Sequence, residues 1–219
     1  MADDIIKKLT QEQVWDKIAP LWNKYKVAHF GDDRKGNLID DFIDKNDKKI
    51  LDLGCGSGRN FKSLIDSGFK GKIYGVDFSR EMLELARENA KKLEIDFELK
   101  KANAWQTGYD DDFFDKIICI ATIHCILKKE NRKKTLIECF RVLKPKGRAL
   151  ITVWNKSNKR WRGKNKEKLV SWNLGDKKVY RYYYLYDQEE LIGELESAGF
   201  KIIKKNFGTG RNIVIECEK

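Results

Sequence analysis

Short apolar runs alternate along this chain with longer segments in which apolar residues recur at helical spacing. Such an alternation is typical of βα units and predicts a parallel sheet with helices on its faces. The predicted strands are Lys49–Leu53, Lys72–Asp77, Asp96–Lys101, Phe114–Ile120 and Arg148–Val153, and the predicted helices are Asn60–Ser67, Arg80–Leu93, Glu130–Val142 and Gln188–Ala198.

Capping residues support the boundaries of these helices. Ser79 is expected to cap the second helix through its side-chain oxygen, and Asp187 with Glu190 is expected to form a capping box for the last. Gly68 and Gly199 stand where a helix commonly ends in a left-handed residue.

The end of the chain predicts a hairpin. Lys144–Gly147 is expected to be a turn that stops a helix before the fifth strand. The last two strands, Lys201–Phe207 and Arg211–Cys217, flank Gly208-Thr-Gly210 and are expected to pair antiparallel. The pattern therefore predicts an α/β fold with a seven-stranded, mostly parallel sheet that ends in an antiparallel hairpin.

Two segments lie outside this alternation. Residues 1–47 contain an amphipathic helix over Gln11–Tyr25, which Pro20 is expected to kink or end. Residues 155–186 form an insertion after the fifth strand, at the edge of the sheet where α/β proteins bind ligands. We expect a single domain over residues 1–219, in which both segments are substrate-side additions.

Composition narrows the class of protein. A chain of 219 residues with 41% hydrophobic content suits one α/β domain. No run of 18 apolar residues exists, so no membrane span is expected, and the first residues lack the apolar core of a signal peptide. Five cysteines without a C-x-x-C pair, and only two histidines, His29 and His124, indicate a reduced cytoplasmic protein without a metal site.

Positive charge gathers in the insertion. Between Lys156 and Arg181 ten basic side chains face two acidic ones, which gives +8 of the net charge of +11. A local basic cluster with interleaved aromatic residues predicts an RNA-binding surface, and a solvated lysine-rich loop is the alternative. The RNA-binding candidates are Lys159, Arg160, Arg162, Lys164, Trp172 and Tyr182.

The most informative motif follows the first strand. Asp52, Gly54, Gly56 and Gly58 form D-x-G-x-G-x-G, and Asp77 closes the second strand 25 positions after Asp52. Glycines in a strand-to-helix turn let a ligand lie against bare backbone, and an acid at the end of the next strand can accept both hydroxyls of a ribose. The spacing differs from the dinucleotide fingerprint, and a tight turn without a ligand is the simpler alternative.

This motif resembles motif I of class I S-adenosylmethionine (SAM) methyltransferases, with Asp77 in the motif II position. The resemblance implies a Rossmann-like sandwich with SAM as the cofactor. Asn103 and Ala104 stand where such enzymes contact the adenine, and a turn-forming Asn103 is the alternative. His124 ends the fourth strand, where these enzymes present the acceptor, although a satisfied structural histidine is as common there.

Further segments narrow the resemblance to one family, the tRNA wobble-uridine carboxymethyl methyltransferases, which include the methyltransferase domain of the AlkB-homologue tRNA enzymes. The chain departs from that family at Cys125, Ser171 and Tyr184. The segments that carry the resemblance are Trp15–Pro20, Ile120–His124, Leu143–Gly147, Ala149–Trp154 and Arg181–Tyr186.

The resemblance implies conversion of a carboxymethyl group on uridine to its methyl ester. A carboxylate is already ionised at neutral pH, so the enzyme has to align and desolvate it, and Arg181, Arg160 or His124 could orient it. The resemblance also implies tRNA and a small zinc-binding activator protein as partners. Asp96–Lys100, expected at the border of the sheet, offers a docking edge for the activator, and the alternative is that its charges serve only to discourage aggregation.

Two other functions remain open from the sequence. The chain could be a class I methyltransferase that acts on a small molecule or a protein, with the lysines merely at its surface. It could also be a nucleoside-binding module without turnover. Salt-sensitive tRNA binding separates the first of these from the tRNA enzyme, and methyl transfer from SAM excludes the second.

Overall fold

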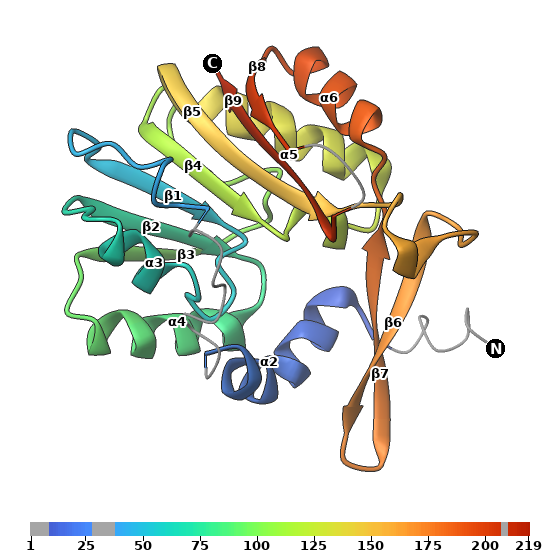
Figure 1. Ribbon diagram of the computed structural model, residues 1–219. Helices are drawn as coiled ribbons and strands as arrows, with labels where there is room; N and C mark the ends of the chain where they lie inside the picture. Colours follow the sequence, from blue (N-terminus) through green and yellow to red (C-terminus); the bar gives the residue numbers. More distant parts are fainter. Residues whose placement is uncertain (1–8, 28–37, 207–209) are drawn as a thin grey trace.

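A seven-stranded sheet forms the centre of this computed structural model, with the strand order β3-β2-β1-β4-β5-β9-β8 (Figure 1). Strands β1 to β5 are parallel, whereas β9 pairs antiparallel with both β5 and β8. The α/β fold and the closing hairpin are therefore as predicted. The strands of this sheet are β1 (Lys49–Leu53), β2 (Lys72–Asp77), β3 (Phe97–Lys101), β4 (Phe114–Ile120), β5 (Leu143–Trp154), β8 (Lys201–Lys205) and β9 (Asn212–Glu218).

The structure describes residues 9–27, 38–206 and 210–219. His29 and the predicted linker at Gly208 lie outside this part of the chain. Within it, no helix is long and apolar enough to cross a membrane, and no three metal-ligating side chains gather. All five cysteines are free thiols, four of them buried.

Helices cover both faces of the sheet, because side chains of a strand alternate between its faces. In β1, Ile50 packs into the apolar core under α3 and α4, whereas Leu51 and Leu53 pack into the core that includes residues of α5 and α6. The main helices are α2 (Gln11–Val27), α3 (Phe61–Asp66), α4 (Arg80–Lys92), α5 (Lys129–Val142) and α6 (Gln188–Ser197).

The fifth strand is longer than predicted. Leu143 already pairs with Phe114, and the register then shifts so that Arg148 pairs with Lys116. The predicted turn over Lys144–Gly147 is therefore a bulge within β5, where Lys146 adopts a φ of +64°. A bulge keeps the chain in the same strand while it takes up the extra residues.

One prediction about the helices is wrong, and one of the two alternatives for Pro20 is excluded. Pro20 does not end α2, which continues to Val27. Asp187 precedes α6, but its side chain makes no capping hydrogen bond, because both Asp187 and Glu190 form ion pairs with Lys166 at 2.7 Å. The predictions for Ser79, Gly68 and Gly199 are confirmed: the Ser79 oxygen accepts the N–H of Met82, and both glycines have positive φ.

The basic insertion forms a second, two-stranded sheet that the pattern did not predict. Strands β6 (Glu167–Leu174) and β7 (Lys177–Tyr184) pair antiparallel as a ribbon, and Gly175 in the tight turn between them has a φ of +59°. A short 3-10 turn at Lys159–Trp161 connects β5 to this ribbon.

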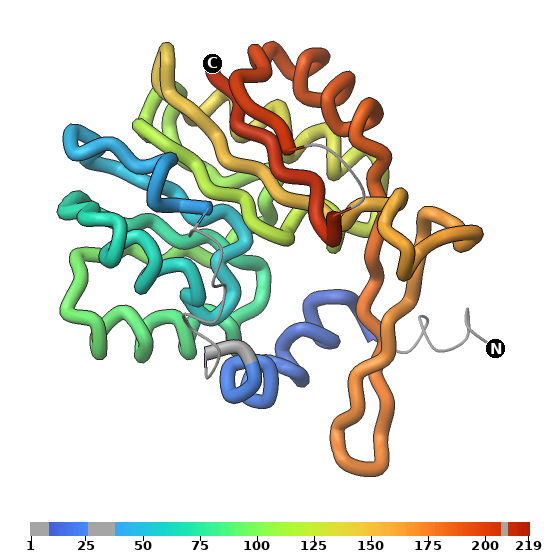
Figure 2. The backbone as a smooth tube through the Cα atoms, viewed as in Figure 1, coloured from blue at the N-terminus to red at the C-terminus, as the bar shows by residue number. Residues whose placement is uncertain are grey.

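The ribbon packs against α2, the N-terminal helix (Figure 2). Val14 and Ile18 of α2 form an apolar cluster with Met82 and Val179, and the rings of Trp22 and Trp172 lie 5.6 Å apart. The two segments that fall outside the βα alternation therefore lie together beside the sheet.

The side chain of Gln11 in α2 hydrogen-bonds to the backbone of β7. The side-chain oxygen of Gln11 accepts the N–H of Tyr182 at 2.9 Å, and its nitrogen donates to the carbonyl of Tyr180 at 3.2 Å. The amide thus pairs with β7 much as a neighbouring strand would.

We expect Gln11→Ala to loosen the contact between α2 and β7 and to lower the free energy of unfolding by about 1–2 kcal/mol, because two partly buried hydrogen bonds are lost. Hydrogen exchange should show faster exchange at the Tyr182 amide. Lys17→Ala, at an exposed position of the same helix, is the control. An unchanged exchange rate at Tyr182 would contradict the role of Gln11.

Candidate active site

A large cleft lies at the carboxyl ends of the parallel strands. Its volume is about 1850 Å³, and it is lined by the segments that follow β1 to β4, by the end of β5, and by α2. Pockets for a single small ligand measure roughly 300–1,000 Å³. The cleft therefore has room for a cofactor together with an acceptor group.

The glycine turn after β1 has the backbone conformation that the motif predicted. Gly54, Gly56 and Gly58 have φ angles of +77°, +55° and +77°, a region that other residues rarely adopt. A Cβ at Gly54 would stand 2.3 Å from the side chain of Thr122, whereas a Cβ at Gly56 would meet only Met82, at 3.9 Å. Gly54 thus serves packing, and Gly56 leaves bare backbone at the cleft.

Asp77 is held rigidly at the floor of the cleft. One carboxylate oxygen accepts the N–H of Gly56 and the other accepts the N–H of Ser79, both at 2.9 Å. Burial raises the pKa of Asp77 to about 6, although these backbone donors favour its charged form. Each oxygen keeps a lone pair for a further donor, as a pair of ribose hydroxyls would require.

Asp52, a predicted cofactor contact, does not line the cleft. Its side chain is fully buried, and both of its oxygens lie 3.2 Å from the amide nitrogen of Asn60, which does line the cleft. Burial raises the pKa of Asp52 to about 7. The contact assigned to Asp52 is therefore corrected: Asp52 orients Asn60, a residue that the motif alone did not single out.

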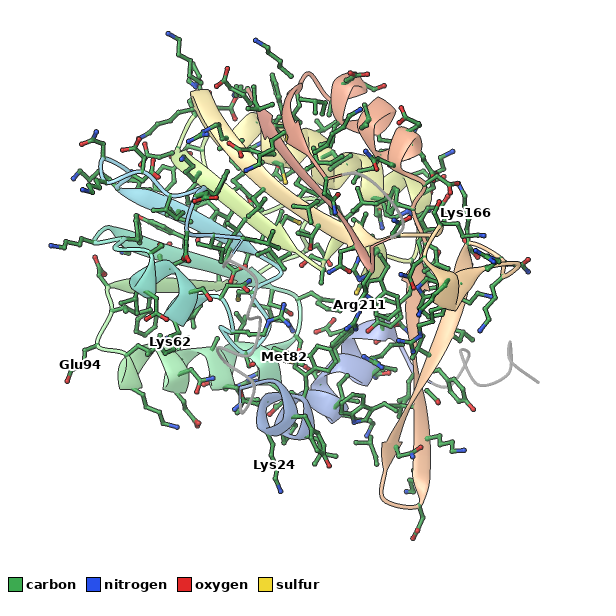
Figure 3. All side chains as sticks on the ribbon, viewed as in Figure 1. Lys24, Lys62, Met82, Glu94, Lys166 and Arg211 are labelled. Atoms are coloured by element: carbon green, nitrogen blue, oxygen red, sulfur yellow. The ribbon has the colours of Figure 1, made fainter. Side chains whose placement is uncertain are left out.

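Asn103 and Ala104 follow β3 and line the end of the cleft that lies farthest from β4 and β5. The carbonyl of Asn103 accepts the N–H of Gln106 at 3.0 Å, which fixes a tight turn there. Met82, at the start of α4, also faces this space (Figure 3). The arrangement leaves the side chain of Asn103 exposed and available to a ligand, and its contact with adenine stays a prediction.

His124 lies at the other end, in a short 3-10 turn after β4. The ring is 1% exposed, and its Nδ1 accepts the backbone N–H of Trp154 at 3.1 Å. Burial, with a smaller contribution from Arg211, lowers the pKa of His124 to about 3, so the ring is neutral at physiological pH. With Nδ1 occupied as an acceptor, the proton resides on Nε2, and His124 is a hydrogen-bond donor.

Arg181, the other candidate for orienting the acceptor, is not among the residues that line the cleft. It is 6% exposed, and the rings of Trp15, Trp22 and Trp172 surround its guanidinium at 4.9–5.8 Å. Its Nη1 donates to the hydroxyl of Tyr183 at 2.7 Å, and the Tyr183 ring stacks on Trp154. This geometry does not support the predicted acceptor contact of Arg181, whose guanidinium instead donates to Tyr183, a residue that lines the cleft.

The aromatic RNA-binding candidates are also committed to packing. Tyr182 is 3% exposed and donates its hydroxyl hydrogen to Glu167, so its ring cannot stack on a base in this structure. Trp172 belongs to the cluster around Arg181, and its indole nitrogen is buried. Trp172 therefore packs the ribbon against α2. The side chain of Tyr182 instead joins β7 to Glu167 of β6 and to Arg132 of α5.

The basic candidates are differently placed. Lys159, Arg160, Arg162 and Lys164 are all exposed, in or directly after the 3-10 turn that follows β5. Trp161 of this turn stacks on Trp154, with ring centroids 5.3 Å apart, and Trp154 lines the cleft. The stacked rings of Trp161 and Trp154 thus lie between the 3-10 turn and the cleft.

Comparison with known proteins gives consistent results. Residues 44–198 match the family described as methyltransferase domain. A protein of Encephalitozoon cuniculi with a provisional methyltransferase name is 30% identical over 86% of both chains. The tRNA (carboxymethyluridine(34)-5-O)-methyltransferase of Arabidopsis thaliana is 31% identical over 68% of this chain, which spans only 33% of that enzyme.

Solved structures show the same fold. A SAM-dependent methyltransferase from Methanosarcina mazei superimposes with a TM-score of 0.71 over 84% of this chain and 97% of its own, at 21% identity. At this identity the likeness concerns the fold alone, and it agrees with the sheet order and the closing hairpin described above.

We expect Asp77→Ala to weaken SAM binding by roughly 1.5–3 kcal/mol, because a hydrogen-bonded charged acceptor is lost. Isothermal titration calorimetry measures the effect. Asp110→Ala removes the same charge at an exposed position and should bind SAM as the parent does. Equal SAM affinity in the parent and in Asp77→Ala would show that Asp77 does not contact the cofactor.

Proposed function

Because this chain belongs to the methyltransferase domain family and is a SAM-dependent methyltransferase, we propose that it methylates the carboxylate of a carboxymethyl-modified wobble uridine in tRNA. The name of the Arabidopsis relative supports this substrate. The chain spans about a third of that relative, so the substrate is proposed on the geometry of the acceptor end as well.

The observation that carries the proposal is the state of His124. Its Nδ1 accepts a backbone N–H and its Nε2 bears the proton, so the ring cannot act as a general base. Burial raises the pKa values of the neighbouring Cys125 thiol and Tyr183 hydroxyl, so neither is a ready base. An acceptor that is already ionised, such as a carboxylate with a pKa near 4, fits this site.

The residues of the cleft then have two tasks. Bound SAM supplies an electrophilic methyl group on a sulfonium sulfur. Gly56 and Asp77 would hold this cofactor by backbone and carboxylate contacts, while the Nε2–H of His124 orients the acceptor. The stacked wall of Trp154 and Tyr183 excludes water, which strengthens the alignment of oppositely charged reactants.

The two additions to the sheet would serve the RNA. Residues 1–47 contribute α2, and residues 155–186 contribute the ribbon and the exposed cations of the 3-10 turn. In our proposal both are substrate-side parts of a single domain over residues 1–219. Phosphate contacts by Lys159, Arg160, Arg162 and Lys164 would bring the wobble nucleoside to the cleft beside Trp154.

The border strand β3 leaves one edge of the sheet unpaired, as predicted from the sequence. Charged and apolar residues alternate over residues 97–100 of this strand. Docking of a zinc-binding activator on this edge stays a prediction of the family resemblance.

Incubation with SAM and tRNA from cells lacking this protein should convert carboxymethyluridine to its methyl ester, as detected by mass spectrometry of the nucleosides. Small-molecule acceptors in the same reaction serve as competitors. Methyl transfer to a competitor with none to tRNA would contradict the proposed substrate, and no transfer to any acceptor would contradict the proposed reaction.

Reversal of Lys159, Arg160 and Arg162 to Glu should abolish tRNA binding and leave SAM affinity intact, because these exposed cations lie outside the cofactor end of the cleft. Filter binding over a series of salt concentrations measures the change, since phosphate contacts make affinity steeply salt-dependent. The matched control reverses Lys45, Lys48 and Lys146, which are exposed near the amino-terminal ends of β1 and β5. Equal tRNA affinity in both variants would assign the basic insertion to a solvated surface.

A further inference from the structure

Arg211, near the carboxyl end of the chain, lines the acceptor end of the cleft, which is the end formed by His124 and Trp154. It stands directly before β9, where Figure 3 labels it. The sheet fixes its position, because its carbonyl accepts the N–H of Asn155 at 3.1 Å and the next residue, Asn212, pairs with Trp154. Arg211 is thus placed by the β5–β9 ladder.

The charge of Arg211 has no counter-ion in the described part of the chain. Arg211 is exposed and forms no ion pair there, whereas Lys62, another cation of the cleft, is paired with Asp66 at 2.7 Å. Its positive charge acts on two groups of the cleft: after burial it contributes to the lowered pKa of His124, and it opposes the larger effect of burial, which raises the pKa of Tyr183.

Arg181 cannot supply this charge to a ligand, because its guanidinium is enclosed by three indole rings and hydrogen-bonded to Tyr183. The donors that line the cleft in the described part of the chain therefore include two of different kinds, the neutral Nε2–H of His124 and the exposed guanidinium of Arg211. A guanidinium matches a carboxylate in shape and charge, and a hydrogen bond to a charged group is about twice as strong as a neutral one.

We propose that Arg211 binds the carboxylate of the acceptor and thereby selects anionic modified nucleosides over neutral ones, an inference that rests on the proposed function. Arg211 holds one carboxylate oxygen, and the lone pairs of the other oxygen stay available for methylation. No proton transfer is needed, in agreement with the neutral donor state of His124.

The test compares two anticodon stem-loop RNAs that differ only at the wobble uridine, one with a 5-carboxymethyl group and one with its neutral amide. Binding is measured by calorimetry on the protein loaded with S-adenosylhomocysteine, so that no turnover occurs. The parent should prefer the carboxylate RNA by roughly 10- to 100-fold. Arg211→Gln should lose this preference, and Arg211→Lys should retain part of it.

Lys204→Gln is the matched control, since it removes one exposed positive charge from β8 of the same hairpin and should keep the full preference. Arg211→Gln should also bind S-adenosylhomocysteine as the parent does. An undiminished preference in Arg211→Gln, or a loss of cofactor affinity equal to the loss of RNA affinity, would overturn the role of Arg211 and leave the proposed function standing. If the parent shows no preference, the proposed function and the role of Arg211 both fall.

Discussion

The buried carboxylate of Asp77 is the constraint on which the rest of the site depends. Its two oxygens take the N–H groups of Gly56 and Ser79, and it thereby joins the glycine turn after β1 to the first turn of α4. Ser79 in turn donates to Asp16 of α2 at 2.6 Å. One carboxylate thus sets the distance between the cofactor turn, the helix beyond it and the helix that covers the cleft, at the cost of a raised pKa.

The centre of the fold could be predicted because its inner strands, such as β1 and β4, are buried on both faces. Apolar residues predominate in Lys49–Leu53 and Phe114–Ile120, and the predicted boundaries of both strands agree with the structure. Strands β6 and β7 were missed because lysines and aromatic residues follow one another there without a regular alternation. In β7 the consecutive residues Arg181, Tyr182 and Tyr183 are all buried, so both faces of the strand are covered. Gly175-Asp176 was a local hairpin signal that could have revealed them.

The site was predictable to the extent that its residues belong to one local turn. The sequence predicts the backbone conformation at Gly54, Gly56 and Gly58, since few other residues tolerate a positive φ. The sequence could not show that Asp52 and Arg181 do not line the cleft, because this depends on contacts made in the fold: Asn60 covers Asp52, and three indole rings enclose Arg181. Arg211 has no local signal at all, because only the pairing of β9 with β5 carries it to His124.

The contact between α2 and the β6–β7 ribbon has a consequence for how the chain folds. Gln11 and Tyr182 are 171 positions apart, whereas the glycine turn, Asp77 and Asn103 all lie within one continuous stretch of βα units. During synthesis, Trp15 and Trp22 therefore leave the ribosome long before their partner Trp172 exists. Contacts of such sequence separation form late. We therefore expect the contacts between α2 and the ribbon to form after the βα units around Asp77 and Asn103 have paired.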